Sequence, residues 1–228
     1  ASALEPMKQI IYSFFLLVML PLGTASVNPS YWKFEWPRTD FFKHIVSFHE
    51  ILSGGSPKGG IPSIDKPKFI KESEETELVD TAPVIGLIVN VEAKAYPLRI
   101  LIWHKIVNDT IGGMPVSVTF CPLCNTAVVY DRRLDGKVLD FGTTGKLRNS
   151  DLVMYDRQTE SWWQQSLGKG IIGEMTRKTL KAVTARLESW ANFRKRAPEG
   201  LVKVPNNSSM RAYGANPYAG YDSLPKPF

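Results

Sequence analysis

Cys121 and Cys124 are the two cysteines of the 228-residue chain, and they stand in the segment TFCPLCNTAVVYD. A CxxC pair can close into a disulfide, act as a redox pair, or offer two thiolate ligands to one metal ion. Which chemistry applies depends on the flanking elements, because those elements decide where the two sulfur atoms point.

The residues that flank the cysteines favour strands rather than a helix. A thioredoxin-type pair opens a helix, whose N-terminus lowers the thiol pKa, whereas Cys124 leads into the β-branched run NTAVVYD. The order strand–CPxC–strand resembles the knuckle of zinc ribbons and rubredoxins, in which a tight turn points two thiolates at one metal. Pro122 helps to fix such a turn, and Asn125 tolerates the left-handed conformation that it requires. The pattern therefore predicts a hairpin with both cysteines at its tip.

A knuckle supplies two ligands, so a metal site needs donors from elsewhere in the chain. The sequence has three histidines, His44, His49 and His104. His104 lies 17 residues before Cys121, across one Gly-Gly turn, and we expect it to return to the same end of a sheet. A set of Cys121, Cys124 and His104 with an open fourth position suits copper or zinc. The alternative, which the sequence leaves open, is a hydrogen-bonded core histidine and a local disulfide.

A second segment, DRQTESWWQQ, joins an Asp–Arg pair, two tryptophans and neighbouring amides in ten residues. We expect Asp156, Trp163 and Gln165 to border the same pocket as the cysteines without binding a metal. In the alternative interpretation, Trp162 and Trp163 alternate across a strand, one in the core and one outside.

Short strand-like segments follow one another between Pro83 and Met175. Asn90 and the pair Asp135-Gly136 are hairpin signals within this region. Strands and turns at this spacing predict a mainly β protein with a few short helices, of the α+β class, folded as a compact barrel- or sandwich-like single domain.

Two other segments have helical spacing. Near the N-terminus, apolar residues recur at Phe41, Ile45, Phe48 and Leu52, as they would on one face of a helix. The second segment is RLESWANFRKRAPEG, in which a proline and a glycine mark the end of the helix. We therefore expect a short helix on either side of the strand-rich region.

Composition is that of an ordinary globular protein, with 43% hydrophobic and 22% charged residues. The formal charge of +6 comes from scattered lysines and arginines, without a basic stripe interleaved with aromatic residues. We therefore expect no nucleic-acid partner. No spacing of Ser, His and Asp marks a catalytic triad, so the sequence assigns no enzymatic reaction and identifies no small ligand or protein partner.

The first residues have the pattern of a signal for export. Lys8 precedes the apolar run Ile10–Leu22, which is followed by the small residues of Gly23–Ala25. The run is short for a membrane span and ends in a signal-peptidase-like site. We expect residues 1–25 to be upstream residues and signal peptide, and 26–228 to be one β-rich domain. The mature protein is then periplasmic or secreted, without a stable membrane anchor. In such an oxidising compartment, an unprotected CxxC pair tends to form a disulfide.

Several long motifs together resemble the exported proteins of domain-of-unknown-function family 3179. The resemblance runs from about Ile51 to Asp222 and is carried by GGSPKGGIPSID, AKAYPLRILIWHKIVND, VTFCPLCNTAVVYDR, FGTTGKLRNSDLVMYDRQTESWWQQ and YGANPYAGYD. It implies an exported, β-rich domain built around the CPLC segment, and it implies no particular activity.

The resemblance also marks individual positions. The family pattern covers His104, Asn108, Asp109, Cys121, Cys124, Asn149, Ser150, Asp156, Thr159, Trp163 and Gln165. Among these we expect Asn108 and Asp109 to lie around the metal ligands, with Asp109 as an acceptor for the second ring nitrogen of His104.

This chain also departs from the family pattern. Gly59 stands where the family usually has Asp, Lys105 where it has Glu, Asn125 where it has Gly, and Trp162 where it has Leu. The loss of two acids weakens any acid–base mechanism that needs them.

Three functions fit these observations. The leading hypothesis is a metal-binding protein that uses the CxxC knuckle and His104 to hold copper or zinc. The second is a non-enzymatic β-rich domain that binds a ligand or a partner and is stapled by a local disulfide. The third is a thiol–disulfide exchange protein.

Overall fold

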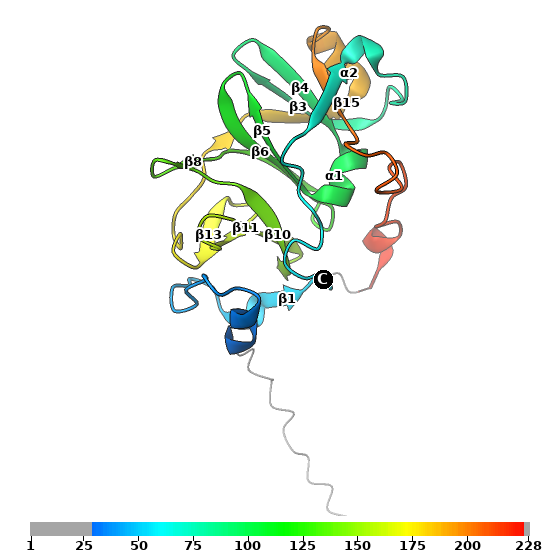
Figure 1. Ribbon diagram of the computed structural model, residues 1–228. Helices are drawn as coiled ribbons and strands as arrows, with labels where there is room; N and C mark the ends of the chain where they lie inside the picture. The colour runs from blue at the N-terminus through cyan, green and yellow to red at the C-terminus, as the bar shows by residue number, and fades with distance from the viewer. Residues whose placement is uncertain (1–28, 226–228) are drawn as a thin grey trace, which may run out of the picture.

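Three sheets and two short helices dominate the computed structural model, which describes residues 29–225 (Figure 1). The first sheet has the order β1 (Ile51–Ser53), β10 (Phe141–Arg148), β11 (Asp151–Asp156), β12 (Trp162–Gln164), β13 (Lys169–Ile172). The second sheet has the order β14 (Ala182–Val183), β7 (Thr126–Asp131), β6 (Met114–Cys121), β5 (Ile106–Ile111). The third sheet has the order β15 (Ala185–Ser189), β3 (Pro83–Val89), β4 (Glu92–Pro97), β16 (Leu201–Val204), β2 (Lys68–Lys71). Neighbouring strands are antiparallel except β16 and β4.

Shorter elements connect and cover these sheets. A small hairpin consists of β8 (Arg133–Leu134) and β9 (Lys137–Val138). The α-helices are α1 (Leu98–His104) and α2 (Trp190–Arg196), and the 3-10 turns are η1 (Pro29–Phe34), η2 (Phe48–Glu50), η3 (Glu72–Glu74) and η4 (Tyr221–Ser223). Within residues 29–225, no helix has the length and apolar character needed to cross a bilayer.

Residues with positive φ make the tight turns between paired strands. Asn90 (φ 54°) lies between β3 and β4, and Asp135 (φ 48°) with Gly136 (φ 74°) lies between β8 and β9. Asn149 (φ 53°) and Ser150 (φ 61°) make the turn between β10 and β11. Asn, Asp and Gly tolerate these conformations best, which is why such pairs favour two-residue hairpin loops. The hairpins predicted at Asn90 and at Asp135-Gly136 are confirmed.

The second sheet lies between the other two (Figure 1). On one side, its buried residues join those of the third sheet and α1 in one apolar cluster, which includes Ile85, Leu101 and Val118. On the other side, they meet the first sheet in a cluster that includes Cys121 and Trp163. The cysteine hairpin is therefore placed at the packing interface of the first and second sheets.

The expected fold class is confirmed, and two details of the expectation need correction. The described residues are mainly β with short helices, and none of their sheets closes into a barrel. The predicted N-terminal helix is wrong, because residues 41–52 form no α-helix and contain only the 3-10 turn η2 and the start of β1. Its apolar spacing has another cause: Phe41 packs edge-on to Trp162, with ring centroids 5.6 Å apart, in a local aromatic cluster.

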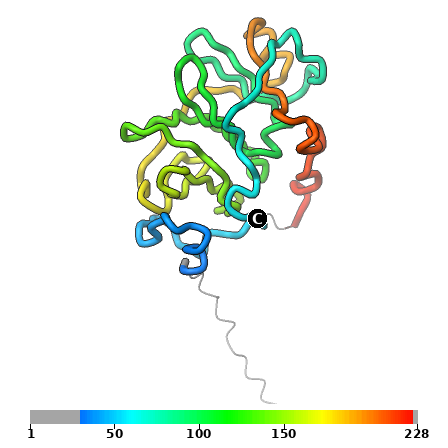
Figure 2. The backbone as a smooth tube through the Cα atoms, in the orientation of Figure 1, coloured from blue at the N-terminus to red at the C-terminus, as the bar shows by residue number. Residues whose placement is uncertain are grey.

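The C-terminal part confirms one helix and adds an extended segment. The helix predicted in RLESWANFRKRAPEG exists as α2, but its first residues belong to β15. We call residues 205–225 the tail segment; it descends past α1 toward the level of β1 (Figure 2). Tyr213 and Tyr218 of the tail segment contact His104 and Lys105, respectively. The predicted signal peptide, residues 1–25, lies outside the described residues and stays a prediction.

Candidate metal centre

The two cysteines lie at the end of a hairpin, as the sequence predicts. Cys121 is the last residue of β6 and pairs in register with Thr126, the first residue of β7. Four turn residues, 122–125, connect the strands, and Asn125 at their end has φ 49°. This is the left-handed conformation expected of it. Both thiols are free.

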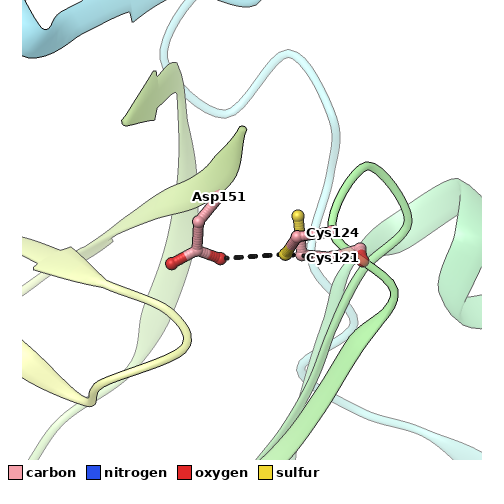
Figure 3. A group of neighbouring side chains, drawn as sticks. All are labelled: Cys121, Cys124 and Asp151. Atoms are coloured by element: carbon pink, nitrogen blue, oxygen red, sulfur yellow. Dashed lines mark hydrogen bonds between the residues drawn. The ribbon is translucent and has the colours of Figure 1, made fainter. Parts of the chain in front are cut away.

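Asp151 completes a group of three potential metal ligands. One carboxylate oxygen of Asp151 and the sulfur atoms of Cys121 and Cys124 all lie within 4.8 Å of one another (Figure 3). Cys124 Sγ donates to Asp151 Oδ1 over 3.5 Å, and Cys121 Sγ lies 3.6 Å from the carbonyl oxygen of Ser150. The β10–β11 hairpin thus brings the residues of its turn and of the start of β11 to the cysteine hairpin.

The carboxylate of Asp151 is fixed from its other side. Its Oδ2 accepts hydrogen bonds from Gln164 Nε2 (2.5 Å), Ser166 Oγ (2.7 Å) and the Ser166 backbone N–H (3.0 Å). Gln164 is itself held, because Arg148 donates to its Oε1 over 3.1 Å. Three donors on Oδ2 leave Oδ1 directed at the thiols. Ligating carboxylates in metal sites are oriented by outer hydrogen bonds of this kind.

Hydrogen bonding makes the two thiols unequal. The pKa of Cys121 is lowered because its sulfur accepts a hydrogen bond from the Cys124 thiol and others from the backbone N–H groups of Cys124 and Leu152, against the effects of burial and of Asp151. The pKa of Cys124 is raised because its one thiol hydrogen can pass from Asp151 Oδ1 to the Cys121 sulfur once Cys121 is ionised, and because burial disfavours its charged form. The first thiolate to form therefore belongs to Cys121.

A buried lysine lies beside this thiolate. Lys105 is 5% exposed and follows α1 with φ 65°, a conformation that turns the chain sharply into β5. Burial lowers the pKa of Lys105 to about 8, and the Cys121 thiolate acts in the opposite direction. Its ammonium lies 4.6 Å from the centre of the Tyr218 ring. The site therefore combines anionic sulfur with a nearby buried cation.

A cavity of about 90 Å³ opens next to Cys121. It lies between the cysteine turn, the bulged part of β10 and the tail segment. Its lining residues are Gly54, Ser56, Ile61, Lys105, Cys121, Pro122, Leu123, Thr143, Gly145, Lys146, Leu147, Leu152 and Tyr218. A small molecule in this cavity would touch the sulfur of Cys121.

His104 is not part of the three-residue group, and this corrects the expected ligand set. Its Nδ1 lies 2.8 Å from the Pro62 carbonyl oxygen, and its Nε2 lies 2.7 Å from the Tyr213 hydroxyl. Both ring nitrogens therefore have hydrogen-bond partners away from the cysteines, and burial lowers the pKa of His104. The physical reason is that His104 ends α1 and faces the tail segment, whereas Lys105 lines the cavity.

Asn108 and Asp109 are also placed away from the thiols. Asn108 accepts from the Phe141 N–H (3.1 Å) and donates to the Phe141 carbonyl (2.8 Å), which ties β5 to β10. Asp109 accepts from Lys94 Nζ (3.1 Å) and from the Tyr96 hydroxyl (2.8 Å). Neither residue contacts His104 through these bonds, so the expected Asp109–His104 pair is corrected as well.

The Asp156–Gln165 segment supports the site from within the core. Trp163 belongs to the same apolar cluster as Cys121, and its Nε1 donates to Asp156 Oδ2 over 2.8 Å. Gln165 Nε2 donates to Thr119 Oγ1 (2.8 Å) and to the Thr126 carbonyl (3.2 Å), both in the cysteine hairpin. None of the three lines the cavity, so the expectation that they border the same pocket as the cysteines is corrected. Trp162 and Trp163 belong to different apolar clusters and are both fully buried, so the alternative that places one of them outside is wrong, although the two side chains do alternate.

Sequence reasoning missed Asp151, Gln164 and Lys146, and it treated Lys105 only as a departure from a family pattern. One signal pointed to Asp151: it directly follows Asn149-Ser150, a pair that favours a tight turn and that belongs to the family motif. A turn signal followed by an acid places that acid at the end of a hairpin, where it can meet another hairpin tip.

The donor set suits a metal ion. Thiolate sulfur and carboxylate oxygen are both ligands of zinc in proteins, and the hydrogen bonds at Cys121 favour the deprotonated form of that thiol. The two cysteines and Asp151 are the only three-residue group of this type within residues 29–225.

Comparison with known proteins gives one family. Residues 58–228 match the model of a family described as "Protein of unknown function (DUF3179)". The matched range includes Lys105, both cysteines and Asp151. No curated protein and no solved structure matches the chain.

Proposed function

The chain belongs to the DUF3179 family, whose description names no activity, and we propose that it is a metal-binding protein with Cys121, Cys124 and Asp151 as ligands. One observation carries the proposal: Oδ2 of Asp151 is held by three donors while Oδ1 faces the thiols. Because Asp151 is 4% exposed, its carboxylate needs hydrogen bonds in any case, and the feature that points to a ligand is that Oδ1 remains directed at the two thiols. Hydrogen bonds to the second oxygen of a carboxylate are the way in which protein ligands are oriented toward a metal ion.

The mixed donor set favours zinc over copper(I). Zinc accepts sulfur and carboxylate oxygen together, with Zn–S distances of about 2.3 Å and Zn–O distances of about 2.0–2.2 Å. Copper(I) prefers soft sulfur ligands, of which this group has two. With three protein ligands, tetrahedral zinc keeps one position for water or a ligand, which is the pattern of catalytic rather than structural zinc sites.

Nearby charge supports the same proposal. Two thiolates and a carboxylate exceed the charge of a divalent ion, so the loaded site has an excess negative charge. Lys105, whose pKa responds to the Cys121 thiolate, is close enough to balance it. A buried cation beside the ligands lowers the cost of keeping both thiols deprotonated.

Thiol–disulfide exchange is the second candidate, and a specific observation favours it. Cys121 has a lowered pKa, and Cys124 is a protonated neighbour positioned to resolve a mixed disulfide. Access counts against it, because the attacking sulfur must reach a disulfide on another molecule. Cys121 is 1% exposed and opens only onto the small cavity. The metal proposal therefore ranks first.

The compartment is a further part of the proposal. The apolar run Ile10–Leu22 and the small residues after it support export to the periplasm. In that oxidising environment a bound metal would protect the two thiols from closing into a disulfide. Mass measurement of the exported protein tests this point: a mass that starts near Ser26 supports it, and a retained N-terminal segment contradicts it.

Metal analysis is the direct test of the function. The protein is isolated without chelator, and its metal content and free thiols are measured on the same sample. The dissociation constants for zinc and copper(I) are then measured by competition with a chromophoric chelator, for the reduced wild type and for Cys121→Ser, Cys124→Ser and Asp151→Asn. Each variant should lose at least about tenfold in zinc affinity, since each removes one ligand.

Two control variants make the result specific. Asp140→Asn removes a carboxylate that pairs with Arg132 away from the cysteines and should leave zinc affinity unchanged. His104→Gln removes the histidine that the sequence favoured and should also leave it unchanged. The proposal fails if the reduced wild type binds neither metal, or if His104→Gln weakens binding while Asp151→Asn does not.

A further inference from the structure

Lys105 is a buried cation that has no carboxylate paired to it and whose neighbouring anion in the protein is the Cys121 thiolate. Lys105 is 5% exposed, and its ammonium group donates to the Ile102 carbonyl and lies over the Tyr218 ring. Within residues 29–225, no carboxylate forms an ion pair with it. Burial of a charge in this way is costly unless an opposite charge is supplied. When Cys121 is protonated, the cavity next to Lys105 is the place from which that charge can come.

Lys146 is a second lysine that lines the same cavity. It lies at the bulge of β10, just after Gly145 (φ 72°), and the bulge shifts the register between Thr143 and Lys146. Its side chain is 11% exposed, and Glu35, the carboxylate paired with it, is 3.8 Å away, near the limit of an ion pair. Two lysines from different parts of the chain thus meet at one small cavity.

The remaining walls of the cavity are mainly apolar. They include Ile61, Pro122, Leu123, Leu147 and Leu152. The volume of about 90 Å³ is less than the roughly 150 Å³ of an apolar cavity that holds benzene. An occupant therefore has about four to six non-hydrogen atoms. Two cations together with apolar walls select a single anionic group on a short hydrocarbon body rather than a densely charged anion, which needs many more donors.

We propose that this cavity binds a small aliphatic carboxylate, whose anionic group is held by Lys105 and Lys146 and whose short chain packs against Leu123, Leu147 and Leu152. The bound molecule touches Cys121, because that residue lines the same cavity. This inference rests on the proposed function in one respect. If zinc is bound at Cys121, the carboxylate would lie beside it, and small carboxylates would then be the ligand class of the metal site.

The probe is butyrate, and butyramide is its neutral counterpart of nearly the same shape. Binding of each to the full chain, reduced and zinc-loaded, is measured at neutral pH by isothermal titration calorimetry. Butyrate should bind at least about tenfold more tightly than butyramide, because only the anion pairs with the lysines. Equal affinities of the two compounds, or absence of saturable butyrate binding, would overturn the proposal.

Variants connect the affinity to the named lysines. Lys105→Met and Lys146→Met keep most of the side-chain length without the charge, and each should weaken butyrate binding about tenfold. Lys137→Met, at an exposed lysine of β9, should leave it unchanged. Circular dichroism checks that each variant folds, and Lys146→Met carries the test if Lys105→Met does not fold. Full butyrate affinity in the folded variants would contradict the proposal.

The two proposals fail separately. Titration of reduced, zinc-free protein with butyrate should still detect binding, because the lysines and the apolar walls do not depend on the metal. If zinc does not bind and butyrate does, the carboxylate site stands and the metal function is refuted. If zinc binds and butyrate does not, the metal function stands and the carboxylate site is refuted.

Discussion

Gln164 Nε2 donates to Asp151 Oδ2 across 2.5 Å, while Oδ1 of the same carboxylate accepts the Cys124 thiol across 3.5 Å. The two oxygens of Asp151 therefore have different partners: Oδ2 accepts from Gln164 and Ser166, and Oδ1 faces the cysteines (Figure 3). Gln164 touches no thiol in these contacts, yet it helps to decide which oxygen points at them.

Replacement of Gln164 tests this positioning. Gln164→Leu removes the donor to Asp151 Oδ2 without removing any ligand, and zinc affinity should fall about 10- to 100-fold. Competition with a chelator measures it, and circular dichroism verifies the fold. Gln158→Leu, at an exposed glutamine that pairs with Asp140, is the matched control and should bind zinc as the wild type does. Unchanged affinity in Gln164→Leu would mean that Asp151 needs no such support.

The left-handed residue of the cysteine turn allows a stability test. Asn125 has φ 49°, so Asn125→Val should lower the free energy of unfolding of the metal-free protein by about 1–2 kcal/mol, because a β-branched residue is disfavoured there. Asn125→Gly should change it by less than about 1 kcal/mol. Urea unfolding followed by circular dichroism gives both values. A Val variant as stable as the Gly variant would count against a left-handed turn.

Local features of the site could be predicted from the sequence. The hairpin at Cys121 and Cys124 follows from β-branched flanks and from Pro122 and Asn125, all within a few residues of each other. Such signals depend only on residues that are neighbours in the sequence, so they can be read without knowledge of the fold. The same is true of the hairpins at Asn90 and Asp135-Gly136.

The third ligand could not be found in this way, because it depends on the packing of two sheets. Asp151 starts β11 of the first sheet, and the cysteines lie in the second sheet. No spacing rule connects the two hairpins. Residue type favours His104, but His104 ends α1 with its Nε2 against Tyr213 of the tail segment, and the next residue, Lys105, lines the cavity.

A buried amide holds the two sheets in register, which gives another prediction. Asn108 satisfies both the N–H and the carbonyl of Phe141 and also donates to Asp65 Oδ1 over 2.9 Å. Asn108→Ala leaves buried polar groups of Phe141 without partners and should lower the free energy of unfolding by about 2–4 kcal/mol. Denaturant unfolding measures this free energy, and Asn192→Ala, at an exposed residue of α2, is the control. A loss below about 0.5 kcal/mol would contradict this role.

The contact between the tail segment and His104 predicts a dependence of stability on pH. Burial lowers the pKa of His104, with Lys203, Arg211 and Lys105 adding to the effect. The folded state therefore favours the neutral ring: its stabilisation is complete above the unfolded pKa of about 6.5 and is lost as pH falls toward the folded pKa. The free energy of unfolding should decrease in that window for the wild type and less for His104→Gln. Parallel curves for the two proteins would contradict the prediction.

Zinc affinity should rise with pH, because the ion replaces protons on the thiols. The pKa of Cys124 is raised by its hydrogen bond to Cys121, so at neutral pH this thiol holds a proton that zinc must displace, while the lowered pKa of Cys121 makes its own proton easier to lose. At least one proton is then released per ion, and the dissociation constant should increase about tenfold for each unit by which pH falls. Chelator competition between about pH 6 and about pH 8 gives this slope, and calorimetry in two buffers of different ionisation enthalpy counts the protons. A dissociation constant that does not vary with pH would show that the thiols are not the ligands.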